Sequence, residues 1–105
     1  MIVDDKNSQD DEIRKNISSL AKKASEYYET ALNYEEKAMY LAAVTAMGAA
    51  KHCYEEIIKL LNEVQSPIER ETGKTIYTVC HSVVSRAFKN LSEKVKKKYS
   101  DAYAV

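Results

Sequence analysis

Apolar side chains recur every three or four positions from Asp11 onward, which is the spacing of one face of an α-helix. The first series predicts a helix from about Asp11 to about Lys37 and comprises Ile13, Ile17, Leu20, Ala24 and Ala31. Acidic residues cluster at its beginning, where negative charge suits the positive end of the helix dipole.

A second series predicts another helix and comprises Tyr40, Val44, Met47, Tyr54, Ile57 and Val64. Its first part, residues 41–50 (LAAVTAMGAA), is small or apolar almost all round. A helix of that kind is normally buried on more than one side, and small residues let helix backbones approach closely. No glycine or proline separates the two series. The second series nevertheless starts a new apolar face at Tyr40, and this change of stripe favours a break between Lys37 and Tyr40 over one long helix.

The third helix has a clear start signal in Ser66-Pro67-Ile68-Glu69, which combines a capping serine, a proline at the first helical position and a glutamate placed for a capping box. Gly73 follows closely and predicts either a frayed first turn or a restart near Thr72. The apolar positions of this helix are Ile76, Val79, Cys80, Val83, Ala87, Leu91 and Val95.

Three helices joined by short connections can hide their apolar faces only against one another. The sequence therefore predicts an all-α protein, a three-helix antiparallel bundle. A chain of 105 residues is one domain by size. We expect a disordered tail at 1–10, the bundle at 11–99 and a frayed end at 100–105.

The charge balance of the chain limits the classes of partner it can bind. Sixteen basic and sixteen acidic residues give zero net charge, which argues against a nucleic acid as the main partner because phosphate binding needs a basic surplus. The first ten residues do not form a signal peptide and no apolar run is long enough to span a bilayer, so we expect a cytoplasmic protein. The lysines of residues 94–98 indicate at most weak contact with a membrane surface.

The cysteine and histidine pairs His52-Cys53 and Cys80-His81 could suggest a zinc site. Adjacent residues on a helix point about 100 degrees apart, so neither pair readily chelates one ion. We expect no metal and no cofactor. No loop motif holds a nucleophile beside a base, so the sequence does not predict an enzyme.

The second and third series resemble the MIT domain, the microtubule-interacting and trafficking module. The resemblance rests on Tyr40-Leu41-Ala42-Ala43 and on residues 76–87 (IYTVCHSVVSRA), where Cys80 and Arg86-Ala87 match the family pattern. It implies binding of the C-terminal tails of ESCRT-III subunits. In that family a helical motif binds between the second and third helices, or an extended, proline-containing motif binds between the first and third.

The resemblance implies that Val84 is an apolar groove residue and that Arg86 is the family's arginine, whereas Phe88 replaces an acidic residue. We therefore predict a peptide-binding groove between the second and third helices, formed by Met47, Tyr54, Val84, Arg86, Phe88 and Leu91. The expected function is a monomeric adaptor domain that recruits an attached protein or enzyme to endosomal membranes.

Two alternatives stay open. A structural or self-associating helical bundle would use its exposed stripe to pair with its own copy. A helical ribonuclease of HEPN type would need an arginine followed by a histidine four to six residues later, and neither His81 nor Arg86 has such a partner.

Overall fold

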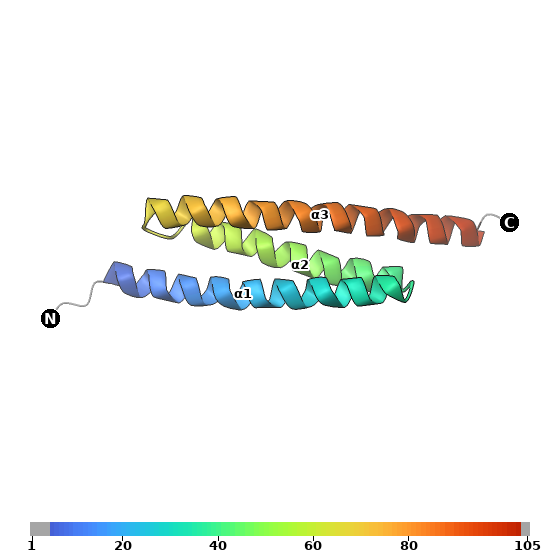
Figure 1. Cartoon of the computed structure of the whole chain (residues 1–105), viewed down its shortest axis with the longest axis horizontal. Helices are drawn as coiled ribbons and strands as arrows, with labels where there is room; N and C mark the ends of the chain where they lie inside the picture. Colours follow the sequence, from blue (N-terminus) through green and yellow to red (C-terminus); the bar gives the residue numbers. More distant parts are fainter. Residues whose placement is uncertain (1–4, 104–105) are drawn as a thin grey trace.

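The computed structural model describes the backbone of residues 5–103 and the side chains of residues 9–100. It contains three antiparallel helices, α1 (Asp5–Glu36), α2 (Tyr40–Leu61) and α3 (Pro67–Tyr103), and no strand within the described range (Figure 1). The predicted all-α three-helix bundle is confirmed.

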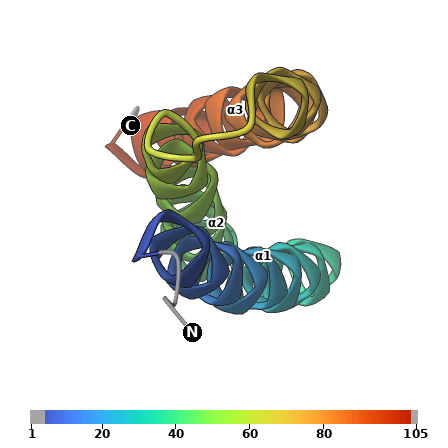
Figure 2. The same cartoon turned by 90° about the vertical axis from the view of Figure 1, so that its left-hand side faces the viewer.

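The three helices do not close into a triangle. α1 packs on α2 and α2 packs on α3, whereas α1 and α3 hardly touch each other. Seen from the end, the helices form a C with α2 at its back (Figure 2). One side of the bundle is therefore left without a helix that would cover it.

Small side chains hold the middle of α2 close to its neighbours. One buried cluster joins all three helices and consists of Ala31, Ala43, Ala46, Met47, Ala50, Val84 and Leu91. Four alanines in this cluster allow the close backbone approach that the sequence LAAVTAMGAA predicts. A second cluster, Ile17, Ile57, Leu61 and Val64, closes the other end of the bundle.

The turn between α1 and α2 lies where the change of stripe predicts it. α1 ends at Glu36 and α2 begins at Tyr40. Ala38 has φ of 58°, the left-handed conformation that glycine usually supplies at a helix end. The break therefore forms without a glycine.

The start of α3 follows the capping signal only in part. The backbone N–H of Glu69 donates to Ser66 Oγ at 3.4 Å, so Ser66 caps the helix. The Glu69 side chain does not reach back to complete a capping box, because it is bonded to Arg14 of α1. The predicted fraying or restart near Thr72 is wrong, since α3 runs unbroken through Gly73. The missing side chain of Gly73 leaves room for Leu61 of α2.

Both ends of the bundle extend the helices beyond their expected limits. α1 begins at Asp5, so residues 5–10 are helical where a disordered tail was expected, and residues 1–4 lie outside the described range. Asp10 is buried and accepts a hydrogen bond from the backbone N–H of Gln65, which ties α1 to the α2–α3 connection. α3 continues to Tyr103, and residues 104–105 lie outside the described range.

Candidate docking groove

The uncovered side of the bundle is hollowed along its length. Three hollows of about 720, 230 and 480 Å³ follow one another between α1 and α3. Their floor comes from α2, with Leu61, Tyr54 and Met47 in turn. Together they form a groove whose walls are α1 and α3, which we call the α1–α3 groove.

The α3 wall of this groove carries large apolar side chains that no other part of the bundle covers. Ile76, Val79 and Val83 are 53%, 60% and 53% exposed and line the hollows. They are spaced three and four residues apart, so they share one face of the helix. Leu32 of α1 is also exposed and lines the third hollow. Exposure of such a continuous apolar stripe to water is unfavourable. Exposed apolar patches of this kind are typical of docking surfaces.

Half of the groove residues predicted from the sequence are core residues in the structure. Met47, Val84 and Leu91 are almost fully buried between α2 and α3 and belong to one cluster. Met47 forms part of the floor of the α1–α3 groove, and Val84 and Leu91 pack the base of the α3 wall onto α2. A peptide lying outside the α2–α3 seam would not contact them.

The other three predicted residues lie apart. Tyr54 is half-buried at the floor of the α1–α3 groove beside Tyr77, with ring centroids 6.3 Å apart, and burial raises the pKa of its hydroxyl. Phe88 packs against α2, with Lys51 Nζ 5.2 Å from the centre of its ring. Arg86 is exposed. The structure thus gathers Met47, Tyr54, Val84 and Leu91 beneath the α1–α3 groove, and Arg86 and Phe88 do not line it.

Charged residues cross the groove at its two ends. At one end, Arg14 of α1 donates through Nε and Nη2 to the two carboxylate oxygens of Glu69 on α3, at 2.7 and 2.8 Å. The hydrogen bonds from Arg14 lower the pKa of Glu69, and the carboxylate raises the pKa of Arg14. Arg14 also donates to Asp11 on its own helix.

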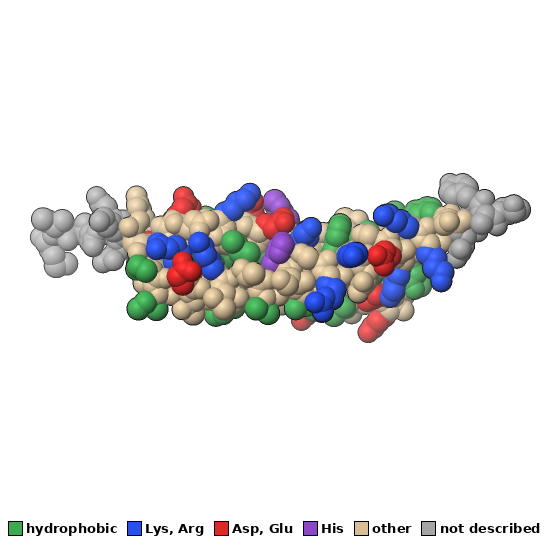
Figure 3. Space-filling model, turned by 90° about the horizontal axis from the view of Figure 1, so that it is seen from above, with side chains coloured by type: hydrophobic (Ala, Val, Ile, Leu, Met, Phe, Trp, Pro, Cys, Tyr) green, Lys and Arg blue, Asp and Glu red, His purple; other side chains and the backbone are tan. Residues whose placement is uncertain are grey.

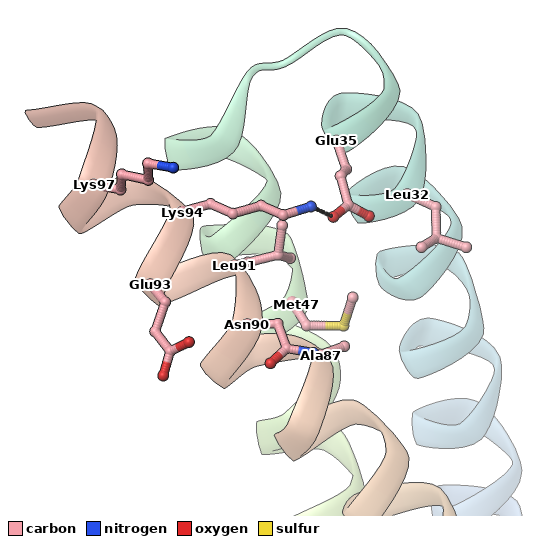
Figure 4. Close-up of a pocket in the computed structure, with 9 residues that line it drawn as sticks. All are labelled: Leu32, Glu35, Met47, Ala87, Asn90, Leu91, Glu93, Lys94 and Lys97. Atoms are coloured by element: carbon pink, nitrogen blue, oxygen red, sulfur yellow. Dashed lines mark hydrogen bonds and ion pairs between the residues drawn. The ribbon is translucent and has the colours of Figure 1, made fainter. Parts of the chain in front are cut away.

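At the other end, Lys94 Nζ of α3 donates to Glu35 Oε2 of α1 at 2.7 Å (Figure 4). This bond raises the pKa of Lys94. Lys94 lies over Leu91 and Met47 and reaches across to the α1 wall (Figure 4). It also sits 5.6 Å from the ring centre of Tyr40, an attractive cation–π distance.

The groove predicted from the sequence does not include the wall residues Ile76, Val79 and Val83. It also lacks the two ion pairs, Arg14–Glu69 and Glu35–Lys94. The stripe was visible in the sequence as an apolar face of the third helix. The exposure of this stripe could not be predicted, because helical periodicity does not say whether a neighbouring helix covers that face.

One cluster elsewhere has the residue types of a hydrolytic triad. Ser85 Oγ lies 3.5 Å from His81 Nδ1, and His81 Nε2 lies 3.2 Å from Glu55 Oε2. None of the three lines a described hollow, and the neighbouring backbone N–H groups are engaged in the helix, so no donor pair is free to stabilise an oxyanion. The hydrogen bond between His81 and Glu55 joins α3 to α2. The face in Figure 3 shows the histidine side chains in purple among basic and acidic side chains.

A further hollow, of about 870 Å³, lies on the outer side of α1 and α2 and includes Tyr27, Met39 and Leu41. Three of its ten lining residues are alanines, and its exposed apolar side chains, Tyr27, Met39 and Leu41, do not repeat along one helix. This hollow therefore lacks the continuous apolar stripe that the α1–α3 groove presents to a partner.

No protein-family model, curated protein or solved structure matches this chain. Among the described residues, no group of three histidine, cysteine, aspartate or glutamate side chains could hold a metal ion. No described helix is both long and apolar enough to cross a membrane.

Proposed function

We propose that this chain is a peptide-binding adaptor domain and that the α1–α3 groove is its docking surface. The observation that carries the proposal is the half-exposed stripe of Ile76, Val79 and Val83, which faces a groove whose two walls do not pack on each other. An apolar segment of a partner protein would cover this stripe and remove it from water.

The expected affinity is modest. Burial of apolar surface contributes about 25 cal/mol per Å², so a few hundred Å² give several kcal/mol before the cost of association is subtracted. That cost is itself at least about 4 kcal/mol. The net free energy of about 4 to 5.5 kcal/mol corresponds to weak binding, with a dissociation constant of about 0.1 to 1 mM.

The resemblance to the MIT domain makes C-terminal tails of ESCRT-III subunits the first partners to test. In that family, an extended, proline-containing tail motif binds between the first and third helices, and this is the mode that fits the open groove. Binding would bring an attached protein or enzyme to endosomal membranes.

A titration of the purified chain against a panel of ESCRT-III C-terminal peptides, followed by calorimetry or fluorescence anisotropy, tests the proposal. Val79→Asp places a charge on the stripe and should weaken binding at least tenfold. Thr78→Asp introduces the same charge at the adjacent, exposed position on another face of α3 and should bind like the wild type. Equal affinity of the two variants would contradict docking in this groove.

Self-association is the second candidate, because the same uncovered stripe could be buried by another copy of the chain. Sedimentation velocity over a hundredfold concentration range distinguishes the two. A dimer that Val79→Asp dissociates and Thr78→Asp leaves intact, with no binding of any tail, would favour self-association over the adaptor role.

A further inference from the structure

The end of the bundle that holds the α1–α2 turn carries an excess of positive charge. Residues 86–105 include six basic and two acidic residues, a net charge of +4 in a chain whose total charge is zero. Among the described side chains, Lys96, Lys97 and Lys98 form no ion pair with a carboxylate. α3 continues past the α1–α2 turn, so these exposed lysines are open to a partner outside the bundle (Figure 1).

Two lysines of α3 approach the turn itself. The Nζ atoms of Lys94 and Lys98 lie 5.6 and 5.7 Å from the ring centre of Tyr40. Lys98 Nζ also donates to the carbonyl of Ala38 at 3.4 Å. Glu35 offsets the charge of Lys94, but the first turn of α2 contains no acidic residue, and the positive end of its dipole adds to the charge of Lys98. The local potential therefore attracts anions.

Exposed apolar side chains lie beside Lys98. Met39, Leu41 and Tyr99 are 48%, 57% and 49% exposed. Leu41 and Lys98 together line two hollows, one of which includes Met39 and the other Tyr99. These four residues thus form one surface, which we call the turn-end patch. None of the four lines the α1–α3 groove.

An anionic bilayer matches both the charge and the apolar side chains of this end of the molecule. Each lysine near an anionic membrane surface contributes about fivefold in affinity. Aliphatic and tyrosine side chains are favoured at the boundary between the headgroups and the acyl chains. A nucleic acid would match the charge alone, because its phosphates are recognised by basic and polar groups.

We infer that this chain docks on anionic membranes through the turn-end patch, with Met39 and Leu41 at the boundary of the acyl chains and residues 96–98 against the headgroups. The lysines in the sequence predict only weak contact, and stable peripheral binding takes a second attraction. The exposed apolar side chains supply it. The inference goes beyond the proposed peptide docking and does not depend on it, because the patch lies outside the α1–α3 groove.

Flotation of the purified chain with lipid vesicles tests the inference. Vesicles of phosphatidylcholine are compared with vesicles of equimolar phosphatidylcholine and phosphatidylserine at low salt. One triple variant removes positive charge from the turn end and comprises Lys96→Gln, Lys97→Gln and Lys98→Gln. Its control removes the same charge from exposed positions of α1 away from the turn and comprises Lys15→Gln, Lys22→Gln and Lys23→Gln.

The wild type should bind the vesicles with phosphatidylserine at least tenfold more tightly than the neutral vesicles, and added salt should weaken this binding. The turn-end variant should lose at least tenfold in affinity, and its control should stay within twofold of the wild type. Absence of wild-type binding to the anionic vesicles, or equal losses in the two triple variants, would overturn the inference.

The apolar part of the patch has its own test. Leu41→Gln should weaken binding to the anionic vesicles several-fold. Ile68→Gln changes an apolar side chain that is 81% exposed at the other end of the bundle and should bind like the wild type. Both positions are exposed, so both melting temperatures should stay within a few degrees of the wild type. Undiminished binding by Leu41→Gln, or tighter binding of polyuridylate RNA than of the vesicles, would show that charge alone is recognised and would refute membrane docking.

Discussion

The backbone N–H of Met39 donates to the carbonyl of Tyr34 at 2.9 Å, across a turn in which Ala38 has φ of 58°. The N–H of Ala38 donates in turn to the carbonyl of Glu35 at 2.9 Å. These two bonds form the Schellman motif that ends many helices, with alanine in the place that glycine usually takes. The molecule thus keeps a mildly strained residue at the hinge between its first two helices.

Replacement of Ala38 by glycine should stabilise the protein. A side chain in the left-handed region costs about 1 to 2 kcal/mol, and the greater chain entropy of unfolded glycine offsets about half of the gain. We expect the free energy of unfolding to rise by about 0.5 to 1 kcal/mol in urea titration. Ala49→Gly, in the right-handed interior of α2, should lower it by about 1 kcal/mol. A loss of stability in both variants would show that Ala38 is not strained.

The two glycines should respond in opposite directions to alanine. A Cβ on Gly73 would lie 2.6 Å from Leu61 Cδ2, and Leu61 is buried, so the clash should outweigh the gain of up to about 1 kcal/mol in helix propensity. A Cβ on Gly48 would lie 3.1 Å from the half-buried ring of Phe88, which can yield by a few tenths of an ångström. Thermal unfolding should place Gly73→Ala below the wild type and Gly48→Ala at or above it.

Stability should fall in acid partly through Glu69. Arg14 holds the pKa of Glu69 below its ordinary value of 4.5, so the carboxylate stabilises the fold. That contribution is fully present above the unfolded pKa and is lost as the pH falls through the lowered folded pKa. The stability gap between the wild type and Glu69→Gln, measured by urea titration, should therefore be open at pH 7 and close as the pH falls through the lowered folded pKa of Glu69. If the stability gap between the two proteins stays constant with pH, protonation of Glu69 does not contribute to the loss of stability in acid.

The neighbours Val83 and Val84 should separate binding from folding. Val84 is buried in the core and Val83 is half exposed on the groove wall. Val84→Asp buries an unpaired charge and should cost about 3 kcal/mol or more of stability. Val83→Asp should keep the melting temperature within a few degrees and lose peptide binding. Circular dichroism and the peptide titration report the two effects separately.

Much of the fold follows from local patterns in the sequence. The three stripes locate the helices, the change of stripe locates the turn before Tyr40, and Ser66 marks the start of α3. These signals are local, because a helix and its cap are determined by residues within one or two turns. The small residues of LAAVTAMGAA also correctly indicate the close-packed centre of α2.

The long-range relationships could not be predicted in this way. Glu69 has the right spacing for a capping box, yet Arg14, 55 positions away, takes its carboxylate. Asp10 looks like part of a polar tail, yet it is buried against the α2–α3 connection. The apolar face of α3 has a buried part, with Val84 and Leu91, and an exposed part, with Val79 and Val83. Helical periodicity contains both parts. Packing against α2 buries the first part, and the second stays open because α1 hardly touches α3.

Chemical-shift mapping by NMR tests the central claim most directly. The ¹⁵N-labelled chain is titrated with the ESCRT-III tail peptide that binds best, and the amide shifts are followed residue by residue. Docking in the α1–α3 groove predicts that the largest changes fall on Ile76, Val79, Val83 and Leu32. The largest changes at Gly48, Arg86 and Phe88, or none with any peptide of the panel, would contradict it.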